Sequence, residues 1–383
     1  MSATAQAAGT HRHLTVSQSG SAIDIHVGSA PFELFGREMR VLVGRPRLAL
    51  VVTAAAPGSQ QASAADAARA AELSARLADD RFAPQTIALG QDPGSVEQAL
   101  ELMRALAERG FTSDDLMVCV GDELLQASCA HVASQWCGGC ALVAVPTSLY
   151  AFARANTPLA LRCAEAPRVV GKAFVGPRAL YADTAALVRD ASERDLLSTR
   201  ALMVSTALAD SDTALGRLSG CAEQLVAGDE ETVANELVAV LRSRGKFMAS
   251  SSSSLRFSAR YGETFAGALA LLSDGAFTTA ELLGEGLRFE ARLAAGMELL
   301  DVDTVLAQDE LLASLGIAER SWALAADDVL AACARYGRLR ANQLQFSLPQ
   351  QPGRVRATVV EDALLRDHVT AWCLSRTAPA AQG

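Results

Sequence analysis

Histidine and aromatic residues are scarce in this chain of 383 residues. There are five histidines, at positions 11, 13, 26, 131 and 368, while Phe, Trp and Tyr together make up 5% of the sequence. No histidine lies between residues 132 and 367. This gap excludes a metal site built on two histidines from most of the chain.

The sequence also lacks long apolar runs and basic clusters. No run approaches about 18 apolar residues and no signal-peptide core is visible, so we expect a cytoplasmic protein with no membrane partner. The formal net charge is -9, and Lys and Arg do not gather beside aromatic residues, which argues against a nucleic-acid partner. Residues 1–20 are polar and are predicted to form a flexible tail.

Eight cysteines are present, and reduced, buried thiols are the expected state for most of them. Cys137 and Cys140 are the exception, because their spacing also suits a redox pair or half of a zinc site. A tight turn from a helix into a strand explains the same spacing, and the sequence has no second CxxC pair. Redox activity at this pair cannot be decided from the sequence.

An alternation of strand and helix patterns fills the first half of the chain. The stretch from Leu116 to Leu149 has the pattern of a strand, a turn, a helix and a second strand. Ser95 and Gln98 fit a capping box at the start of another helix. Strands are predicted at 22–27, 48–52, 86–89, 116–120 and 141–145. This alternation predicts a doubly wound parallel sheet, a Rossmann-like α/β domain over residues 21–180.

Helical periodicity prevails from about residue 184 onward. Apolar residues recur every three or four positions, which predicts an all-α second domain over residues 181–383, with a cleft between the two domains. The predicted helices are 184–194, 196–211, 230–245, 256–273, 278–297, 302–314, 324–336 and 358–374.

Several short segments carry a family resemblance. The stretch 116–149 aligns without a gap to a strand, a glycine-rich turn, a helix and a V-P-T-T-L segment. The further matching segments are Val170–Phe174, Pro177, Asp183–Thr184, Tyr261–Phe265 and Leu282–Glu285. On these segments the sequence resembles the dehydroquinate synthase and sugar phosphate cyclase family. The resemblance implies the two-domain fold above and an obligate dimer, either a homodimer or a heterodimer with a homologue.

The resemblance also shows where the NAD site of the family is altered. Gly121, Asp122 and Glu123 stand where the family keeps glycines against the pyrophosphate. Two carboxylates there would repel a diphosphate. The loop at 90–96, where the family has a lysine that holds the nucleotide, has none. We therefore expect no NAD, with a degenerate cofactor site at these residues; bound NAD would mean that this interpretation is wrong.

The family holds a divalent metal with one glutamate and two histidines. In this chain the resemblance places Ala201, Glu263 and Leu283 at those positions. At most one ligand remains, whereas such a site needs three. We therefore expect no metal, and bound zinc would contradict that expectation.

The sequence keeps charged residues at more of the family's anion-binding positions than at its metal-ligand positions. The resemblance places Arg154, Arg242, Arg256 and Arg260 around the expected pocket, with Glu263 as a possible general base. Four arginines there could bind a carboxylate or a phosphate. The alternative is that these arginines pair with acids or face solvent.

Three hypotheses about function follow from these residues. The first is a repurposed lyase or cyclase that acts without NAD or metal on a small anionic intermediate of specialised, natural-product biosynthesis. The second is a catalytically inactive member, a pseudoenzyme, that serves as a dimerisation or regulatory partner of an active homologue. The third is an orthodox NAD- and zinc-dependent sugar phosphate cyclase.

Overall fold

The computed structural model divides the chain into two compact units, Met1–Ala191 and Ser192–Gly383. It describes residues 11–377 except 19–20, 46, 57, 60, 91, 158, 164–165, 174–175, 274 and 339–341, and for 166–173 it describes the backbone alone. The units divide later than the predicted boundary at residue 180, because the strand and helix that follow residue 178 still pack on the sheet.

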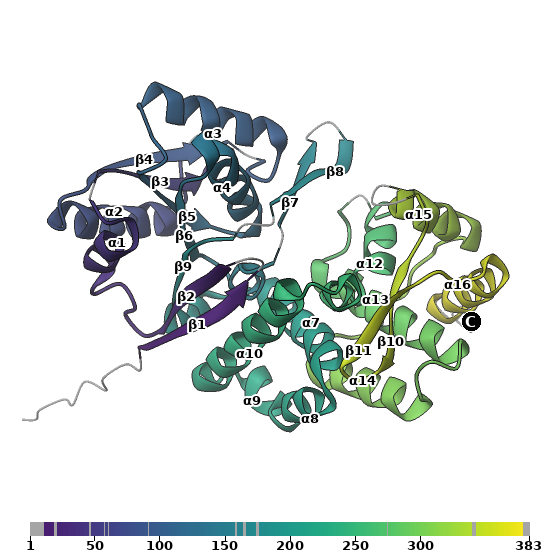
Figure 1. The fold of residues 1–383 in the computed structure, drawn as a ribbon. Helices are drawn as coiled ribbons and strands as arrows, with labels where there is room; N and C mark the ends of the chain where they lie inside the picture. Colours follow the sequence, from purple (N-terminus) through teal and green to yellow (C-terminus); the bar gives the residue numbers. More distant parts are fainter. Residues whose placement is uncertain are drawn as a thin grey trace, which may run out of the picture. The chain divides into compact units, whose positions relative to one another are not determined.

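The first unit is built on a seven-stranded sheet with the order β1-β2-β9-β6-β5-β3-β4 (Figure 1). The strands are β1 Arg12–Gln18, β2 Ser21–Gly28, β3 Leu48–Ala54, β4 Ala83–Leu89, β5 Leu116–Gly121, β6 Ala141–Pro146 and β9 Ala179–Asp183. Only the β1–β2 pair is antiparallel within this sheet. The predicted Rossmann-like parallel sheet is confirmed.

Helices cover both faces of this sheet. They are α1 Phe35–Val43, α2 Ala64–Asp79, α3 Val96–Glu108, α4 Glu123–Gln135, α5 Leu149–Arg154 and α6 Thr184–Asp190, and a separate hairpin pairs β7 Leu159–Cys163 with β8 Ala166–Ala173. Side chains of β5 alternate between the two cores: Met117 packs with α3 and α4, whereas Val118 packs with α1 and α2. Such a strand is buried on both faces and therefore has a continuous apolar sequence.

The prediction that residues 1–20 form a flexible tail is wrong for residues 12–18. They form the edge strand β1, which pairs with β2 from Arg12 opposite Val27 to Gln18 opposite Ser21. Leu14 and Val16 alternate with exposed residues, which is the pattern of a half-buried strand, but the run is short and polar on its outer side.

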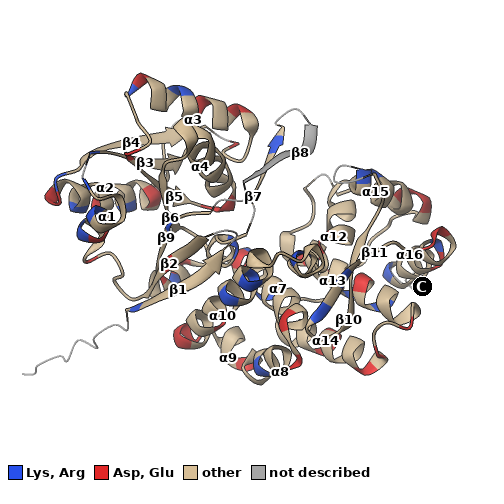
Figure 2. Ribbon diagram, in the orientation of Figure 1, with Lys and Arg blue, Asp and Glu red and all other residues tan. Residues whose placement is uncertain are grey.

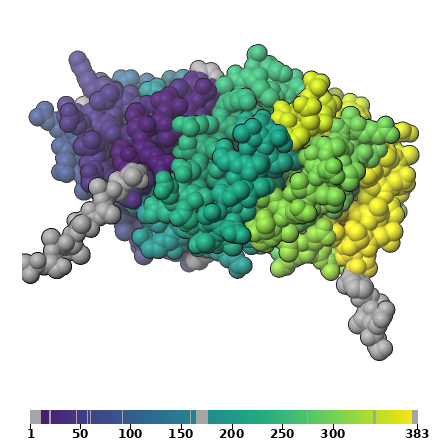
Figure 3. All heavy atoms as spheres, turned by 90° about the horizontal axis from the view of Figure 1, so that it is seen from below, coloured from purple at the N-terminus to yellow at the C-terminus, as the bar shows by residue number. Residues whose placement is uncertain are grey.

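The second unit is mainly helical, as predicted. Its helices are α7 Glu193–Asp210, α8 Asp212–Gly220, α9 Ala222–Ala227, α10 Glu230–Ala249, α11 Ser253–Ser258, α12 Glu263–Ala270, α13 Thr279–Gly296, α14 Val302–Ser314, α15 Ala326–Arg338 and α16 Asp362–Arg376. A two-stranded hairpin, β10 Phe346–Gln351 with β11 Arg354–Thr358, corrects the expectation of an all-α domain. Figure 3 shows α16 (yellow) beside residues of the light-green segment near 300–320.

The predicted helix 256–273 is two helices, α11 and α12. Gly262 separates them with φ at +83°, and a Cβ at this position would lie 2.8 Å from Leu287 Cδ2. Only glycine combines this left-handed backbone with so close an approach. The break sets where α12 begins, and Glu263 is its first residue.

Candidate functional site

Asp122 closes the start of α4 at the carboxyl end of β5. Its carboxylate accepts the backbone N–H groups of Leu124 at 3.1 Å and of Leu125 at 3.0 Å. Gly121 precedes it, and a Cβ there would lie 2.5 Å from Leu125 Cδ2. Backbone N–H groups at such a helix start are the ones that bind phosphate in nucleotide folds. Here the chain's own carboxylate occupies two of them.

The loop after β4 lies against this helix start. The Ser128 hydroxyl of α4 donates to the Pro93 carbonyl. Ser95 accepts the Gln98 N–H at 3.2 Å, but the Gln98 side chain accepts the Gly90 N–H at 2.6 Å instead of completing the predicted capping box. The loop is thus tied to α3 and α4 by hydrogen bonds of its own.

Further carboxylates follow the ends of neighbouring parallel strands. Asp66 lies in the first turn of α2, and its pKa is raised, mainly by burial and in part by the charge of Asp122. Asp183, at the end of β9, caps α6 by accepting the Ala186 N–H at 3.0 Å. Arg69 Nη2 lies 3.8 Å from Asp183 Oδ2 and offsets part of this charge. Asp122 still places negative charge where a bound dinucleotide would need positive or neutral groups.

In the second unit, a buried carboxylate organises the start of α12. Glu290, on α13, accepts the backbone N–H groups of Gly262 at 2.9 Å, Thr264 at 3.0 Å and Phe265 at 3.1 Å. Burial raises the pKa of Glu290 to about 8, against the lowering effect of these three donors and of Arg260. The contacts fix Glu263 in the first turn of α12, where it is partly exposed.

Two of the predicted anion-binding arginines lie just before α12. Arg256 donates to the carbonyl groups of Ser250 at 2.6 Å and Ser251 at 3.1 Å, so its guanidinium is engaged by backbone. The Arg260 guanidinium lies over the Phe257 ring, 5.0 Å from its centroid. Such a stacked guanidinium is held in one plane, and the Nε atom of Arg260 is buried.

The other two arginines lie on separate helices. Arg154, at the end of α5 in the first unit, donates to the Tyr150 hydroxyl at 3.4 Å and lies over that ring. Arg242 is exposed on α10 in the second unit. Its neighbour Arg244 is buried, 1% exposed, and donates to the Ala259 carbonyl at 3.2 Å. The roles of the four predicted arginines stay predictions.

Comparisons with known proteins agree with this architecture. No family model matches the sequence. The 3-dehydroquinate synthase of Corynebacterium jeikeium (strain K411) is 26% identical over 303 residues, 75% of this chain and 78% of that protein. A 2-deoxy-scyllo-inosose synthase solved with carbaglucose-6-phosphate, NAD+ and Co2+ is similar in structure, with a TM-score of 0.74, 16% identity and coverage of 94% of this chain and 99% of that one. This chain is thus similar in sequence to a 3-dehydroquinate synthase and has the fold of sugar phosphate cyclases.

A second cyclase fold neighbour is ValA, the 2-epi-5-epi-valiolone synthase of Streptomyces hygroscopicus subsp. jinggangensis 5008, solved with NAD+ and Zn2+ bound. Its TM-score is 0.73 at 16% identity, over 93% of this chain and 98% of that one. At this identity the likeness shows the fold of the cyclase-like chain, and its chemistry depends on its own side chains.

The residues at the three metal positions of this cyclase-like chain do not fit zinc. Ala201 in α7 and Leu283 in α13 are buried, and neither side chain has an atom that binds a metal. Glu263 supplies one carboxylate, whereas zinc takes three or four protein ligands. Within the described part of the chain, no group of three or more His, Cys, Asp or Glu is arranged to hold a metal ion.

The start of α4 does not fit the NAD pyrophosphate either. The Asp122 carboxylate would have to leave the N–H groups of Leu124 and Leu125 before a phosphate oxygen could reach them. Even then its charge would stay beside the diphosphate and repel it.

The pair Cys137 and Cys140 lies in a tight turn between α4 and β6, as one of the two interpretations predicted. Cys137 adopts a left-handed backbone with φ at +49°, and both cysteines are free thiols. Cys137 is exposed, whereas burial raises the pKa of Cys140 to about 12. Cys140 is therefore a poor nucleophile at neutral pH.

Sequence reasoning missed Glu290 and the buried Arg244. Both are charged residues within helical segments that otherwise look amphipathic, and their partners are backbone groups distant in sequence. The only local signal is that Glu290 interrupts an apolar stripe of α13, at a position where a charge must find a partner once buried.

Among the described residues, no helix is long and apolar enough to span a bilayer. Arginine and acidic residues both occur along α1, α2 and α3 (Figure 2).

Proposed function

We propose that this cyclase-like chain is a repurposed lyase or cyclase that works without NAD and without a metal on a small anionic intermediate of specialised biosynthesis, in the cytoplasm and as a homodimer or a heterodimer with a homologue. The observation that carries the proposal is the Asp122 carboxylate on the N–H groups of Leu124 and Leu125, which places a fixed negative charge where the pyrophosphate would lie.

In this proposal Glu263 is the general base. Its position in the first turn of α12 is set by the three hydrogen bonds that Glu290 accepts. A carboxylate so placed removes a proton from a substrate carbon; the C–H electron pair forms a C=C bond as the C–O bond to a β-hydroxyl or β-phosphate breaks, and the protonated Glu263 gives its proton to the leaving oxygen, so the elimination involves no redox change. Arg260, stacked on Phe257 in the same unit as Glu263, binds the substrate anion.

The test is turnover of a panel of sugar phosphates and hydroxylated carboxylates, followed by proton NMR in NAD-free buffer with a metal chelator. We expect one class to be converted, and Glu263→Gln to abolish conversion while the fold, measured by circular dichroism, is unchanged. The matched control is Glu310→Gln, an exposed glutamate of α14, which should keep full activity.

Conversion that requires added NAD or zinc would contradict the proposal. Unchanged conversion by Glu263→Gln would contradict the role of Glu263 alone.

A second candidate is the inactive partner of an active homologue. It is favoured by Arg256, whose guanidinium is already engaged by two backbone carbonyl groups, and by the exposure of Arg242. Absence of conversion for every compound, together with stable co-purification of a cyclase homologue, would support this candidate over the first.

A further inference from the structure

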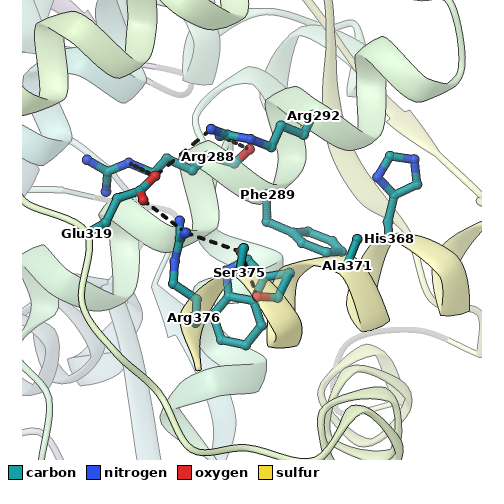
Figure 4. A pocket seen from close by; sticks show the side chains of 9 residues that line it. Arg288, Phe289, Arg292, Glu319, His368, Ala371, Ser375 and Arg376 are labelled. Carbon is teal, nitrogen blue, oxygen red and sulfur yellow. Dashed lines mark hydrogen bonds and ion pairs between the residues drawn. The ribbon is translucent and has the colours of Figure 1, made fainter. Parts of the chain in front are cut away.

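A cavity of about 400 Å³ lies in the second unit, between α13, α16 and the segment that follows α14 (Figure 4). Its lining residues are Arg288, Phe289, Arg292, Glu319, His368, Ala371, Trp372, Ser375 and Arg376. Arg288 and Arg376 are buried at its base, with side chains 3% and 7% exposed, whereas Arg292 and Glu319 lie at its mouth, 46% and 47% exposed. None of these residues belongs to the site proposed above.

The carboxylate of Glu319 lies where three guanidinium groups converge. Glu319 Oε2 is 3.0 Å from Arg376 Nη1, and Oε1 is 3.5 Å from Arg288 Nε and 3.9 Å from Arg292 Nη2 (Figure 4). An exposed glutamate on an irregular segment can rotate its side chain out to solvent. The anionic group of a ligand can therefore replace the Glu319 carboxylate between these arginines.

The charge around the cavity is balanced only with Glu319 in place. Arg376 also donates to Glu285 at 2.9 Å, and Arg292 donates to Asp309 at 2.6 Å. Three arginines thus face three carboxylates. When Glu319 turns away, one positive charge remains at the base of the cavity, and a monoanion restores neutrality.

Arg288 has unused hydrogen-bonding capacity. Its Nη2 donates to the Ile317 carbonyl, but Nε and Nη1 make no hydrogen bond among the described residues. Three carboxylates lie nearby without forming one: Glu319 at 3.5 Å and Asp309 at 3.8 Å from Nε, and Glu285 at 3.9 Å from Nη1. These ion pairs offset the burial of the Arg288 charge, and the two N–H groups stay available to an acceptor with better hydrogen-bond geometry. A carboxylate accepts two parallel N–H groups from one guanidinium.

The rest of the lining is partly apolar, beside the polar side chains of His368 and Ser375. Phe289, Ala371 and the Trp372 ring line the cavity, and Trp372 Nε1 is already used by Glu285 at 2.8 Å. The apolar part of the lining suits a ring or a short chain. We propose that this cavity is a binding site for a small organic monocarboxylate with an aromatic or apolar body, whose carboxylate takes the place of that of Glu319 between Arg288 and Arg376.

Isothermal titration calorimetry of the full chain with benzoate tests the site, with benzamide as the neutral analogue of the same shape. We expect saturable 1:1 binding of benzoate and binding of benzamide weaker by about tenfold or more. Glu319→Gln, which removes the competing carboxylate, should tighten benzoate binding by about tenfold, and Ala371→Phe, which fills the cavity without changing its charges, should abolish it. Arg320→Ala, in the same segment but outside the lining, is the matched control.

Three results would overturn the site: no saturable heat with either wild type or Glu319→Gln up to about 10 mM benzoate, equal binding of benzamide, or unchanged binding by Ala371→Phe. Arg288→Met should also abolish binding, provided that circular dichroism shows a folded protein. Benzoate binding that is lost in Glu263→Gln but kept in Ala371→Phe would place the ligand at the proposed catalytic site and not in this cavity.

Discussion

The starts of α4 and α12 lie at the two positions where the family resemblance places a cofactor and a metal ligand, and each is closed by a carboxylate of the chain. Asp122 caps α4 from the residue directly before the helix. Glu290 caps α12 from α13, 25 to 28 residues later in the sequence. The first cap forms from local sequence alone, whereas the second exists only when two helices are packed. The capping carboxylate is therefore supplied by local sequence at α4 and by the packing of two helices at α12.

The largest loss of stability is expected from Glu290→Ala. This change leaves three buried N–H groups of the α12 start without an acceptor, so the free energy of unfolding should fall by about 3–5 kcal/mol. Urea denaturation followed by circular dichroism measures it. Glu310→Ala, at an exposed glutamate, should change stability by less than about 0.5 kcal/mol. A loss below 1 kcal/mol for Glu290→Ala would show that the long-range cap is dispensable.

The second expected effect is a dependence of the unfolding free energy on pH through Glu290. The pKa of Glu290 is raised from 4.5 to about 8, so the folded state keeps a proton that the unfolded state has released between these values. The stability contributed by this group is therefore present at low pH and lost as the pH rises toward 8, by at most about 1.4 kcal/mol per pH unit. The difference in unfolding free energy between wild type and Glu290→Gln should decrease from pH 5 to pH 8. An increase would mean that the ionised carboxylate is the favoured form.

A third and smaller effect is expected at the α4 start from Gly121→Ala. The added methyl group would lie 2.5 Å from Leu125 Cδ2, so Leu125 must shift within the buried core. We expect a loss of about 1–3 kcal/mol, measured by urea denaturation. Gly110→Ala, where nothing lies within 4 Å of the added Cβ but φ is positive, is the control for backbone strain alone. Equal losses in the two variants would remove the packing explanation.

The smallest effect is expected from Asp122 itself. Asp122→Ala removes a half-buried local cap and should cost about 1 kcal/mol, whereas Asp122→Asn keeps a capping oxygen and should cost less than about 0.5 kcal/mol. Thermal unfolding measures both. If Asp122→Ala destabilised the chain as much as Glu290→Ala, the distinction between the local and the long-range cap would be lost.

The negative charge at the start of α4 could be predicted from the sequence, and the long-range cap of α12 could not. Asp122 stands directly after an apolar strand and before a helix, so its charge at the expected phosphate position was readable, although its capping hydrogen bonds were not. Glu290 acts on residues that come close only in the folded unit. For the same reason, the convergence of Arg288, Arg292 and Arg376 on Glu319 has no signature in the sequence.

The strands that are buried on both faces were predicted well, but the edge strand β1 was not. β3, β5 and β6 are continuous apolar runs, whereas β1 is a short alternating strand that resembles a polar tail. The break between α11 and α12 was missed because one glycine within a periodic segment is tolerated in many helices. Its effect became visible only with the approach of Leu287 to Gly262.

The most direct test of the central claim is native mass spectrometry of the chain after incubation with NAD and zinc, beside ValA treated in the same way. ValA is the matched control because its solved structure holds NAD+ and Zn2+. We predict that this chain shows no added mass for NAD or zinc under conditions in which ValA carries both. One NAD and one zinc per chain would contradict the account, because neither the Asp122 cap nor Ala201 and Leu283 would then have removed the family's cofactor chemistry.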